Sequence, residues 1–360
     1  MTSLPLRPTA VPEYDVRATL VQASDAGSPV AANAAPASSG LRVCVVIPTY
    51  RRADMLERCL RAVLCQTLPA HCYEVVVADD GPDRSVLAVL ERLASPTGPA
   101  LRYVPVTASQ GPAGARNRGW EQARAPVVAF TDDDTVPAAQ WLEAGLAALS
   151  GGAAAVAGGV SMPIGDPPTD YERNESGLTT AEFVTANCFV TRRALEEVGG
   201  FDERFRMAWR EDSDLQFALL ARGYRIAREP RALVVHPVRP AAPGVSLRQQ
   251  RKVLFDALLY KKWPAQYRAR IRPRPPWNYF LIVASLLLAA GAALTGAWRL
   301  AGMAMALWTL LTLHFCAGRL KGTSHAPAHV LEMLATSALI PPLSVYWRLR
   351  GAWQFRTRFL

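Results

Sequence analysis

The sequence predicts an α/β protein whose mostly parallel sheet is flanked by helices and followed by a C-terminal transmembrane helical hairpin. Short β-branched runs alternate with segments of helical periodicity, which is typical of βαβ units. Acidic residues directly follow two of these runs, at the edge where parallel sheets bind ligands. Two long stretches near the C-terminus carry almost no charge, which predicts helices that cross a membrane.

Composition divides the chain into successive parts. Residues 1–40 are rich in Ala, Pro and Ser and lack hydrophobic periodicity, so we expect a disordered arm. We expect the α/β domain over residues 41–240, a basic amphipathic segment over 241–276 and a membrane domain over 277–360.

The net charge of +10 predicts an anionic partner. Much of the excess lies between Arg248 and Arg274, directly before the first long apolar stretch, which favours a membrane surface over nucleic acid. The six cysteines show neither metal-ligand spacing nor a disulfide framework. We interpret them as buried thiols in a reducing cytosol.

The first half of the α/β domain alternates strands with helices. We expect strands at 43–47 and 101–106, a strand in YEVVVADDGP that runs into Asp79 and Asp80, and helices at 54–66 and around 86–93. A glycine-bearing turn in GPAGARNRGWEQA then enters a helix that carries Arg116 near its start. The carboxyl ends of these strands are expected to share one edge of the sheet.

Three adjacent carboxylates, Asp132, Asp133 and Asp134, follow the strand expected at 127–130. Two like charges about 4 Å apart repel by roughly 1 kcal/mol in water and by about 4 kcal/mol at an effective dielectric near 20. A divalent cation removes this repulsion, and carboxylate oxygens suit Mg²⁺ or Mn²⁺. The alternative is a solvated acidic turn that caps a helix starting near Ala138.

The second half of the domain has a strand expected at 153–160, then SMPIGDPPTDYERNES, whose turn residues predict a loop that covers the site. The segment TTAEFVTANCFV is expected to form a strand or a short helix. Helices are expected at 193–198 and 210–222, and a final strand at 232–235 ends in His236. Acids in the first turn of the 210–222 helix could simply complement its dipole.

Six segments in this order resemble family 2 glycosyltransferases of the GT-A fold: VVIPTYRR, VVVADDGP, GARNRGW, FTDDDTVP, ANCFVTRRALEEVGGFDERF and EDSDLQFALLARGYRI. The resemblance covers residues 41 to about 236. It implies a Rossmann-like sheet and an inverting transferase that uses a nucleotide-diphosphate sugar and a divalent cation, Mg²⁺ or Mn²⁺.

By position, the resemblance implies that Pro48, Thr49 and Tyr50 line the nucleotide pocket. Asp79 is expected to hydrogen-bond the base, and Arg116 to lie near the nucleotide.

In the Asp-x-Asp motif of this family, Asp132 matches the residue near the ribose and Asp134 the metal ligand. The middle residue, Asp133, is also acidic, so the register could shift by one, and we include it among the donor-binding residues. His236 is a further candidate near the metal or diphosphate, with a plain buried histidine as the alternative.

Asp212 matches the catalytic base in the Glu-Asp pair of the family. Such a group takes the proton of the acceptor hydroxyl as the hydroxyl attacks the anomeric carbon. Asn187, Trp209 and Glu211 are expected to line the site on the acceptor side. The Gln-x-x-Arg-Trp motif of processive members is missing after the Glu-Asp pair, so transfer of a single sugar is expected.

Two transmembrane helices are expected, at residues 278–297 and 300–317. Residues 328–347 are expected to form a re-entrant or interfacial segment, because Glu332 and the Pro341-Pro342 pair interrupt the apolar run there. In SLRQQRKVLFDALLYKKW, apolar residues on one helical face between cations predict a helix lying on anionic lipid. Basic residues on both sides of the hairpin indicate a multi-pass protein of the cytoplasmic (inner) membrane, with its catalytic domain in the cytosol.

The predicted function is therefore transfer of one sugar to a hydroxyl acceptor, lipid-linked or a growing cell-surface glycan, at the cytoplasmic membrane face. The expected partners are the nucleotide-diphosphate sugar, that acceptor and membrane lipids, with no nucleic acid. Two alternatives are a metal-dependent nucleotidyltransferase and a non-catalytic, nucleotide-binding membrane scaffold. A dinucleotide-dependent oxidoreductase is not expected, because no Gly-x-Gly-x-x-Gly follows the first strand.

Overall fold

The computed structural model describes residues 14–15, 40–108 and 111–360. The chain divides into two compact units, Met1–Ser161 with Glu182–His236, and Met162–Ala181 with Pro237–Leu360. The predicted disordered arm lies outside the described residues, apart from Gly40 and the two residues of strand β1 (Tyr14–Asp15).

Within the described residues, the first unit is built on a nine-stranded sheet in the order β1-β4-β3-β2-β5-β8-β7-β9-β6. The strands after β1 are β2 (Val43–Thr49), β3 (Tyr73–Asp79), β4 (Ala100–Pro105), β5 (Val127–Thr131), β6 (Val136–Pro137), β7 (Ala155–Ser161), β8 (Asn187–Thr191) and β9 (Ile226–Val235).

Strands β4, β3, β2 and β5 are parallel, as predicted. Beyond β5 the sheet is mixed, because β8 runs antiparallel to both β5 and β7, and β6 runs antiparallel to β9. The prediction of a mostly parallel sheet is therefore right for the first half only. Apolar periodicity identifies a strand but does not encode its direction.

The helices of this unit are α2 (Ala53–Val63), α3 (Arg84–Leu93), α4 (Pro112–Glu121), α5 (Trp141–Leu149), α7 (Arg192–Val198) and α8 (Glu211–Ala221), with the short 3₁₀ turn η1 (Ala70–Cys72). The predicted strands and helices are confirmed within a few residues at their ends. The final strand is the exception, because it begins at Ile226 rather than at Ala232.

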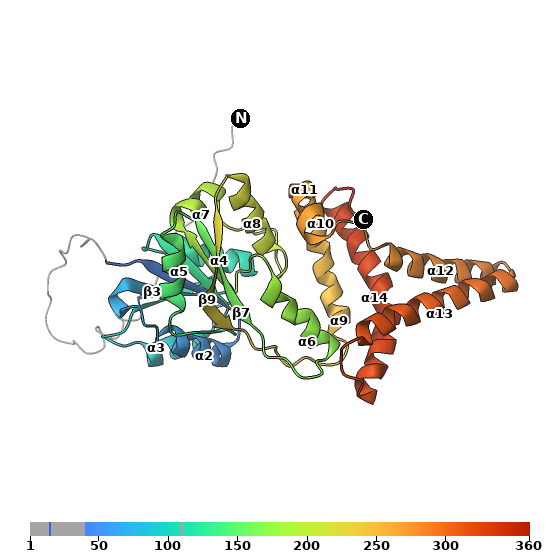
Figure 1. Ribbon diagram of the computed structural model, residues 1–360, viewed down its shortest axis with the longest axis horizontal. Coiled ribbons are helices and arrows are strands. Elements are labelled where there is room, and N and C mark those ends of the chain that lie inside the picture. The colour runs from blue at the N-terminus through green and yellow to red at the C-terminus, as the bar shows by residue number, and fades with distance from the viewer. Residues whose placement is uncertain (1–13, 16–39, 109–110) are drawn as a thin grey trace. The chain divides into compact units, whose positions relative to one another are not determined.

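Both faces of the central strands are buried, as their continuous β-branched runs predict. Val43, Val45 and Ile47 of β2 pack in one core with residues of α2, α3 and α5, whereas Cys44 and Val46 pack in a second core with residues of α4, α7 and α8 (Figure 1). Successive residues of a strand point to opposite faces, so one short run contributes to both cores. The polar residues at the strand ends are thereby left at the edge of the sheet.

The second unit consists of helices: α6 (Asp170–Glu175), η2 (Ser176–Thr180), α9 (Val245–Gln249), η3 (Gln250–Val253), α10 (Leu254–Lys262), α11 (Pro264–Gln266), η4 (Tyr267–Ile271), α12 (Trp277–Leu294), α13 (Trp298–Leu320) and α14 (Pro327–Gln354). One of them, α6, corrects the prediction of a loop in SMPIGDPPTDYERNES. α6 forms there because Thr169 and Glu172 make a capping box, each side chain accepting a backbone N–H of the other residue.

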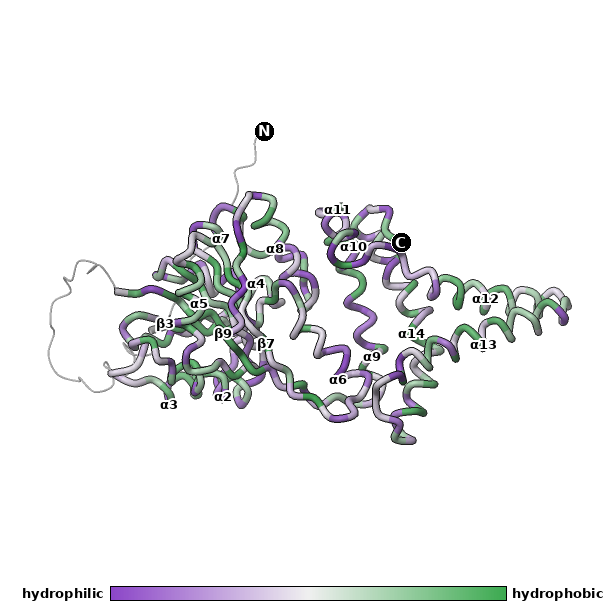
Figure 2. Tube along the Cα trace, viewed as in Figure 1, coloured by the Kyte–Doolittle hydropathy of each residue, from purple (hydrophilic) through white to green (hydrophobic). Residues whose placement is uncertain are grey.

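Three helices among the described residues, α12, α13 and α14, are long and apolar enough to cross a membrane by length and composition. The first two coincide with the predicted hairpin. Their leucines are largely exposed in the protein alone, including Leu287 and Leu310, and Figure 2 shows predominantly hydrophobic colour along both helices. Such an apolar surface is unusual for a water-exposed helix and fits contact with lipid. The helices therefore indicate membrane association.

The third apolar run departs from its predicted form. Pro341 and Pro342 do not interrupt it, because both lie inside the continuous 28-residue helix α14. Apolar helices tolerate proline where neighbouring helices hold them, and α14 packs against both α12 and α13.

The apolar face expected to lie on lipid is instead buried by protein. Leu254, Ala257 and Leu258 of α10 are buried, and α10 packs against α14. The two helices approach closely at Gly351, where a Cβ would lie 2.6 Å from the carbonyl oxygen of Leu254. An amphipathic pattern predicts an apolar partner, and here that partner is a helix of the same unit.

All six cysteines are free in this structure. Four are buried as expected, but Cys65 is exposed and Cys72 is partly exposed. Both follow α2 near the short η1 turn, where the chain runs over the surface of the unit.

Candidate functional site

The acidic loop after β5 is a tight turn that directs neighbouring carboxylates apart. The hydroxyl of Thr135 donates to the carbonyl oxygen of Asp132 at 2.9 Å and lies 2.6 Å from the hydroxyl of Thr131. Asp133 and Asp134 are almost fully buried, whereas the side chain of Asp132 is 26% exposed. The loop therefore carries three acids with different surroundings.

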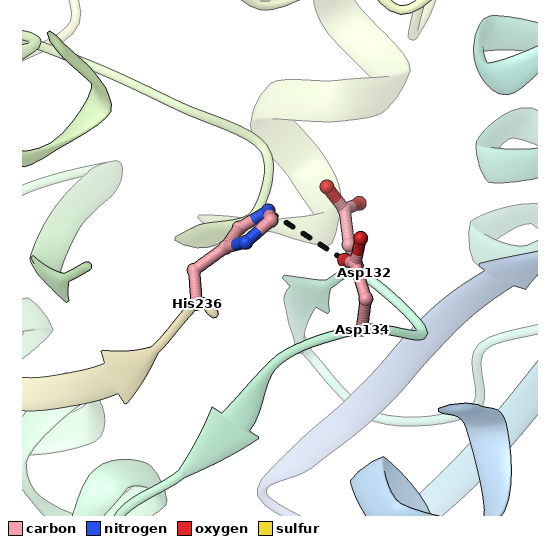
Figure 3. A group of neighbouring side chains, drawn as sticks. All are labelled: Asp132, Asp134 and His236. Atoms are coloured by element: carbon pink, nitrogen blue, oxygen red, sulfur yellow. Dashed lines mark ion pairs between the residues drawn. The ribbon is translucent and has the colours of Figure 1, made fainter. Parts of the chain in front are cut away.

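Asp132, Asp134 and His236 form a cluster whose potential ligand atoms all lie within 4.8 Å of one another. Figure 3 shows these side chains converging from the loop after β5 and from the end of β9. His236 is held by its backbone N–H, which donates to Ser161 at 2.8 Å, and its Nε2 lies 3.5 Å from Asp134 Oδ1. Two carboxylates and one imidazole at this spacing fit a divalent cation, which would offset their charge.

Asp133 points to a different neighbour. Its carboxylate accepts a hydrogen bond from Thr49 at 2.8 Å and pairs with Arg52 at 3.3 Å, which ties the loop to the end of β2. Burial raises the pKa of Asp133 to about 6, although Arg52 opposes the rise. The geometry thus favours the register in which Asp132 and Asp134, not Asp133, face the cation.

Arg116 of α4 links the acidic loop to α8. Its guanidinium donates to Asp132 at 2.7 Å and to Glu211 at 3.1 Å, and only 3% of the residue is exposed. Burial lowers the pKa of Arg116, but the two carboxylates outweigh it and raise the pKa above its ordinary value. Arg116 is therefore a fixed cation between two elements that are far apart in sequence.

Asp212 lies in the first turn of α8, next to Glu211. Its Oδ1 accepts hydrogen bonds from the N–H and the hydroxyl of Ser213, at 2.6 and 3.2 Å. Burial raises the pKa of Asp212 and also raises that of Glu211, to about 7. Because Glu211 contacts Arg116, the structure brings the Glu-Asp pair to the same arginine as Asp132.

Asp79 ends β3 beside Thr49, its register partner in β2. Its Oδ2 accepts from the N–H of Asp83 at 2.8 Å and from the hydroxyl of Tyr103 at 3.0 Å. The other oxygen, Oδ1, is buried without a hydrogen-bond partner. An acceptor left unmatched in this way is costly unless a ligand donates to it.

Pro48 and Tyr50 flank Thr49 at the end of β2. Tyr50 is 47% exposed, and its ring packs against Gly81, where a Cβ would lie 2.9 Å from the ring at a φ of 131°. Pro48 pairs in register with Ala78 in β3. The end of β2 therefore presents a half-exposed aromatic ring, with the guanidinium of Arg51 5.1 Å from its centre, next in sequence to the register partner of Asp79.

Asn187 and Trp209, both expected on the acceptor side, have surroundings that differ from those of the other site residues. Asn187 is fully buried, donates to the carbonyl oxygens of Gly159 and Ala232, both at 2.7 Å, and accepts from Trp141 at 2.8 Å. It joins strands inside the sheet, which corrects the expectation that it lines the acceptor side. Trp209 lies partly exposed before α8, with the guanidinium of Arg210 4.3 Å from its ring centre.

Sequence reasoning missed Arg52 and Asp80 as site residues. Arg52 contacts Asp133, and Asp80 accepts the N–H of Gly111 at 2.7 Å, which fixes the start of α4 and hence Arg116. Asp80 lies at the predicted edge of the sheet, but its hydrogen bond with Gly111 depends on tertiary packing and is not encoded in a local pattern.

The chain is similar to known proteins over most of its length. The family model described as glycosyl transferase family 2 matches residues 44–215, and the one described as glycosyl transferase family group 2 matches residues 169–338. Glycosyltransferase AglE of Haloferax volcanii is 31% identical over 59% of this chain and 71% of its own length. The pre-mycofactocin glycosyltransferase of Mycobacterium tuberculosis is 32% identical over 55% of this chain but only 43% of its own length.

A solved structure shares the fold. The mannosyltransferase PcManGT from Pyrobaculum calidifontis, in complex with GDP-Man and Mn²⁺, matches with a TM-score of 0.51 and 20% identity, and the match covers 87% of each chain. This likeness confirms the predicted GT-A type of fold.

Proposed function

The chain belongs to glycosyl transferase family 2, and from that premise we propose that it moves one sugar from a nucleoside-diphosphate sugar to a hydroxyl acceptor, with inversion at the anomeric carbon. The observation that carries this proposal is the convergence of acids from separate strands and helices. Asp132 and Asp134 face His236, while Arg116 joins Asp132 to the helix that bears Asp212.

We propose that Asp132, Asp134 and His236 hold the divalent cation, Mg²⁺ or Mn²⁺. When bound, the cation supplies positive charge to the departing diphosphate. The ligand set supports this assignment, since carboxylate oxygens predominate and the three ligand atoms converge. The related fold of PcManGT was solved with GDP-Man and Mn²⁺, which supports the same class of donor here.

Asp212 is the proposed general base. The acceptor oxygen forms a bond to the anomeric carbon, the bond from that carbon to the diphosphate oxygen breaks, and the acceptor proton passes to the carboxylate of Asp212. The first turn of α8 supports this role because the N–H and the hydroxyl of Ser213 hold the carboxylate in place. Arg116 contributes a second fixed positive charge near the site.

The proposed nucleotide site is formed by Pro48, Thr49, Tyr50 and Asp79. The ring of Tyr50 offers a face against which a base can stack, and the unmatched Oδ1 of Asp79 can accept a hydrogen bond from the base. Trp209 stays a proposed contact on the acceptor side.

We propose that the enzyme is a multi-pass protein of the inner membrane, with its catalytic domain in the cytosol. Its proposed acceptor is lipid-linked or a glycan. The apolar helices support membrane association, and the basic residues between Arg248 and Arg274 support the cytosolic side.

The direct test is to incubate the purified full chain with a panel of nucleotide sugars, Mn²⁺ or Mg²⁺ and a membrane lipid extract, and to analyse the products. We expect release of a nucleoside diphosphate together with a glycosylated lipid. Pyrophosphate as product would support a nucleotidyltransferase instead. Donor binding without turnover under all these conditions would support a scaffold.

A further inference from the structure

The second unit contains a cavity of about 350 Å³ that the proposed catalytic site does not use. Its volume lies in the range of small-ligand pockets. Three separate segments form its wall: residues 169–172, residues 238–246 except Gly244, and the first turns of α14 at residues 329–333.

Hydrogen bonds hold these segments together. His329 Nε2 accepts the backbone N–H of Asp170 at 3.1 Å, and Glu332 accepts the N–H of Gly244 at 2.7 Å. Arg319 at the end of α13 pairs with Asp170 at 2.7 Å. Each wall is therefore tied to another element of the unit, and the cavity does not depend on a loose loop.

The polar groups of the wall disfavour an anionic ligand. Three carboxylates line the cavity, those of Asp170, Glu172 and Glu332, whereas Arg239 is the single arginine or lysine among the lining residues. Arg319, which lies outside the lining, neutralises Asp170. The charged groups that remain in the lining are the carboxylates of Glu172 and Glu332 and the guanidinium of Arg239. A phosphate would meet net repulsion here.

The remaining features suit a ligand with several hydroxyl groups. Ser246 Oγ is buried with no hydrogen-bond partner in the protein, so it can exchange a hydrogen bond with a ligand. Tyr171 adds an aromatic side chain, and carboxylates are strong acceptors for hydroxyl donors. Proline and alanine side chains supply apolar contact in residues 240–243.

The cavity also lies close along the chain to both the catalytic and the membrane parts. Val238 is the second residue after His236 of the proposed metal cluster, and His329 belongs to the first turn of α14.

We propose that this cavity binds the uncharged, hydroxyl-rich head group of the acceptor, a sugar carried on a lipid, while the linking phosphate and the lipid chain stay outside it. The proposal rests on the proposed function, because it assigns the acceptor subsite of the same reaction. It narrows the acceptor from any hydroxyl-bearing lipid to one that already carries a sugar.

The test compares two tryptophan substitutions in the full chain, reconstituted in nanodiscs. Ala242→Trp fills the cavity from an exposed lining position whose side chain makes no polar contact, and Ala265→Trp adds the same side chain at an exposed position outside it. The probes are farnesyl-phosphate-linked glucose, galactose, mannose and N-acetylglucosamine, with farnesyl phosphate as the sugar-free control. Binding is measured directly, without donor, and transfer is measured separately.

We expect at least one glycosylated probe to bind the parent protein, with at least a tenfold loss of affinity in Ala242→Trp and no loss in Ala265→Trp. Ser246→Ala should weaken the same probe by a smaller factor, and farnesyl phosphate should bind all variants alike. Hydrolysis of donor without acceptor should be unchanged in Ala265→Trp.

Three results would overturn the proposal: no glycosylated probe binds the parent, Ala242→Trp binds the sugar-bearing probes as well as the parent does, or the substitution weakens farnesyl phosphate equally. Specific glycolipid binding without any transfer would instead contradict the proposed function and leave the cavity assignment standing.

Discussion

Arg319 and Arg116 are buried arginines of the helical unit and of the α/β unit, and their guanidinium groups are satisfied differently. Arg319, 7% exposed in the helical unit, donates from Nε and Nη2 to Asp170 and from Nη1 to the hydroxyls of Thr336 and Ser337. Arg116, 3% exposed in the α/β unit, makes one hydrogen bond to each of two carboxylates, and its Nε has no partner.

Other buried groups at the carboxyl edge of the sheet and at the start of α8 are also incompletely matched. Glu211 Oε2, Asp79 Oδ1 and Asp80 Oδ1 are buried without hydrogen-bond partners. Each missing partner costs about 1–3 kcal/mol, which a ligand that supplies the missing contacts would offset. Arg348 of the helical unit also has two unmatched nitrogen atoms, so an unmatched group indicates a binding site only beside a cluster such as Asp132, Asp134 and His236.

The largest effect is expected at Asp212. Asp212→Asn removes the proposed base but keeps an oxygen that can accept from Ser213, so transfer should fall by about 10²–10⁴-fold with donor affinity unchanged. Turnover and donor binding are measured on the same preparation. Transfer within a few-fold of the parent would remove Asp212 from the mechanism.

The next effect concerns Arg319 and separates stability from activity. Arg319→Met removes the closer of the two arginines that pair with the partly buried carboxylate of Asp170, so the free energy of unfolding should fall by about 1–3 kcal/mol. Replacing both partners, in Asp170→Leu with Arg319→Met, should recover much of this loss. A double variant as unstable as the two single changes added together would show that the pair does not act as a unit.

At the metal cluster, Asp134→Ala should abolish the Mn²⁺ or Mg²⁺ dependence of donor affinity, a change of about 10–100-fold or more. Asp54→Ala, at an exposed carboxylate in the first turn of α2, is the matched control. Donor affinity is titrated with and without the metal. An unchanged response to metal in Asp134→Ala would contradict the assignment.

The smallest effect is a change in pH dependence. Burial raises the pKa of Glu211 to about 7 from its ordinary 4.5, so the folded state binds this proton more tightly than the unfolded state. The contribution of Glu211 to the free energy of unfolding therefore decreases as pH rises from about 4.5 to 7, and Glu211→Gln should reduce this slope in metal-free buffer. Glu91→Gln, at an exposed residue, should leave the slope unchanged. If the free energy of unfolding changed equally with pH in both variants, Glu211 would not be a buried group with a raised pKa.

The sequence alone predicted the sheet edge well. Buried strands that end in Asp79 and Asp132 had to meet if they were parallel, and β2, β3 and β5 are parallel neighbours. It could not predict that Arg116 joins Asp132 to Glu211, because that contact depends on how α4 and α8 pack rather than on any local pattern.

Other residues show why local patterns mislead. Asn187 has the residue type of a site contact, but its amide satisfies backbone groups inside the sheet. The apolar face of α10 has the same periodicity whether it packs on lipid or on α14. By contrast, the Thr169 to Glu172 capping box was readable in the sequence, but the surrounding prolines and glycine indicated a loop.

The central claim is that Asp132, Asp134 and His236 hold a cation against the donor diphosphate. The most direct measurement is pulsed electron paramagnetic resonance of Mn²⁺ bound to the full chain with UDP or GDP. We predict coupling of the metal to phosphorus of the diphosphate and to an imidazole nitrogen that disappears in His236→Ala. Bound Mn²⁺ with no phosphorus coupling for either nucleotide, and a spectrum unaltered by Asp134→Ala, would contradict the account.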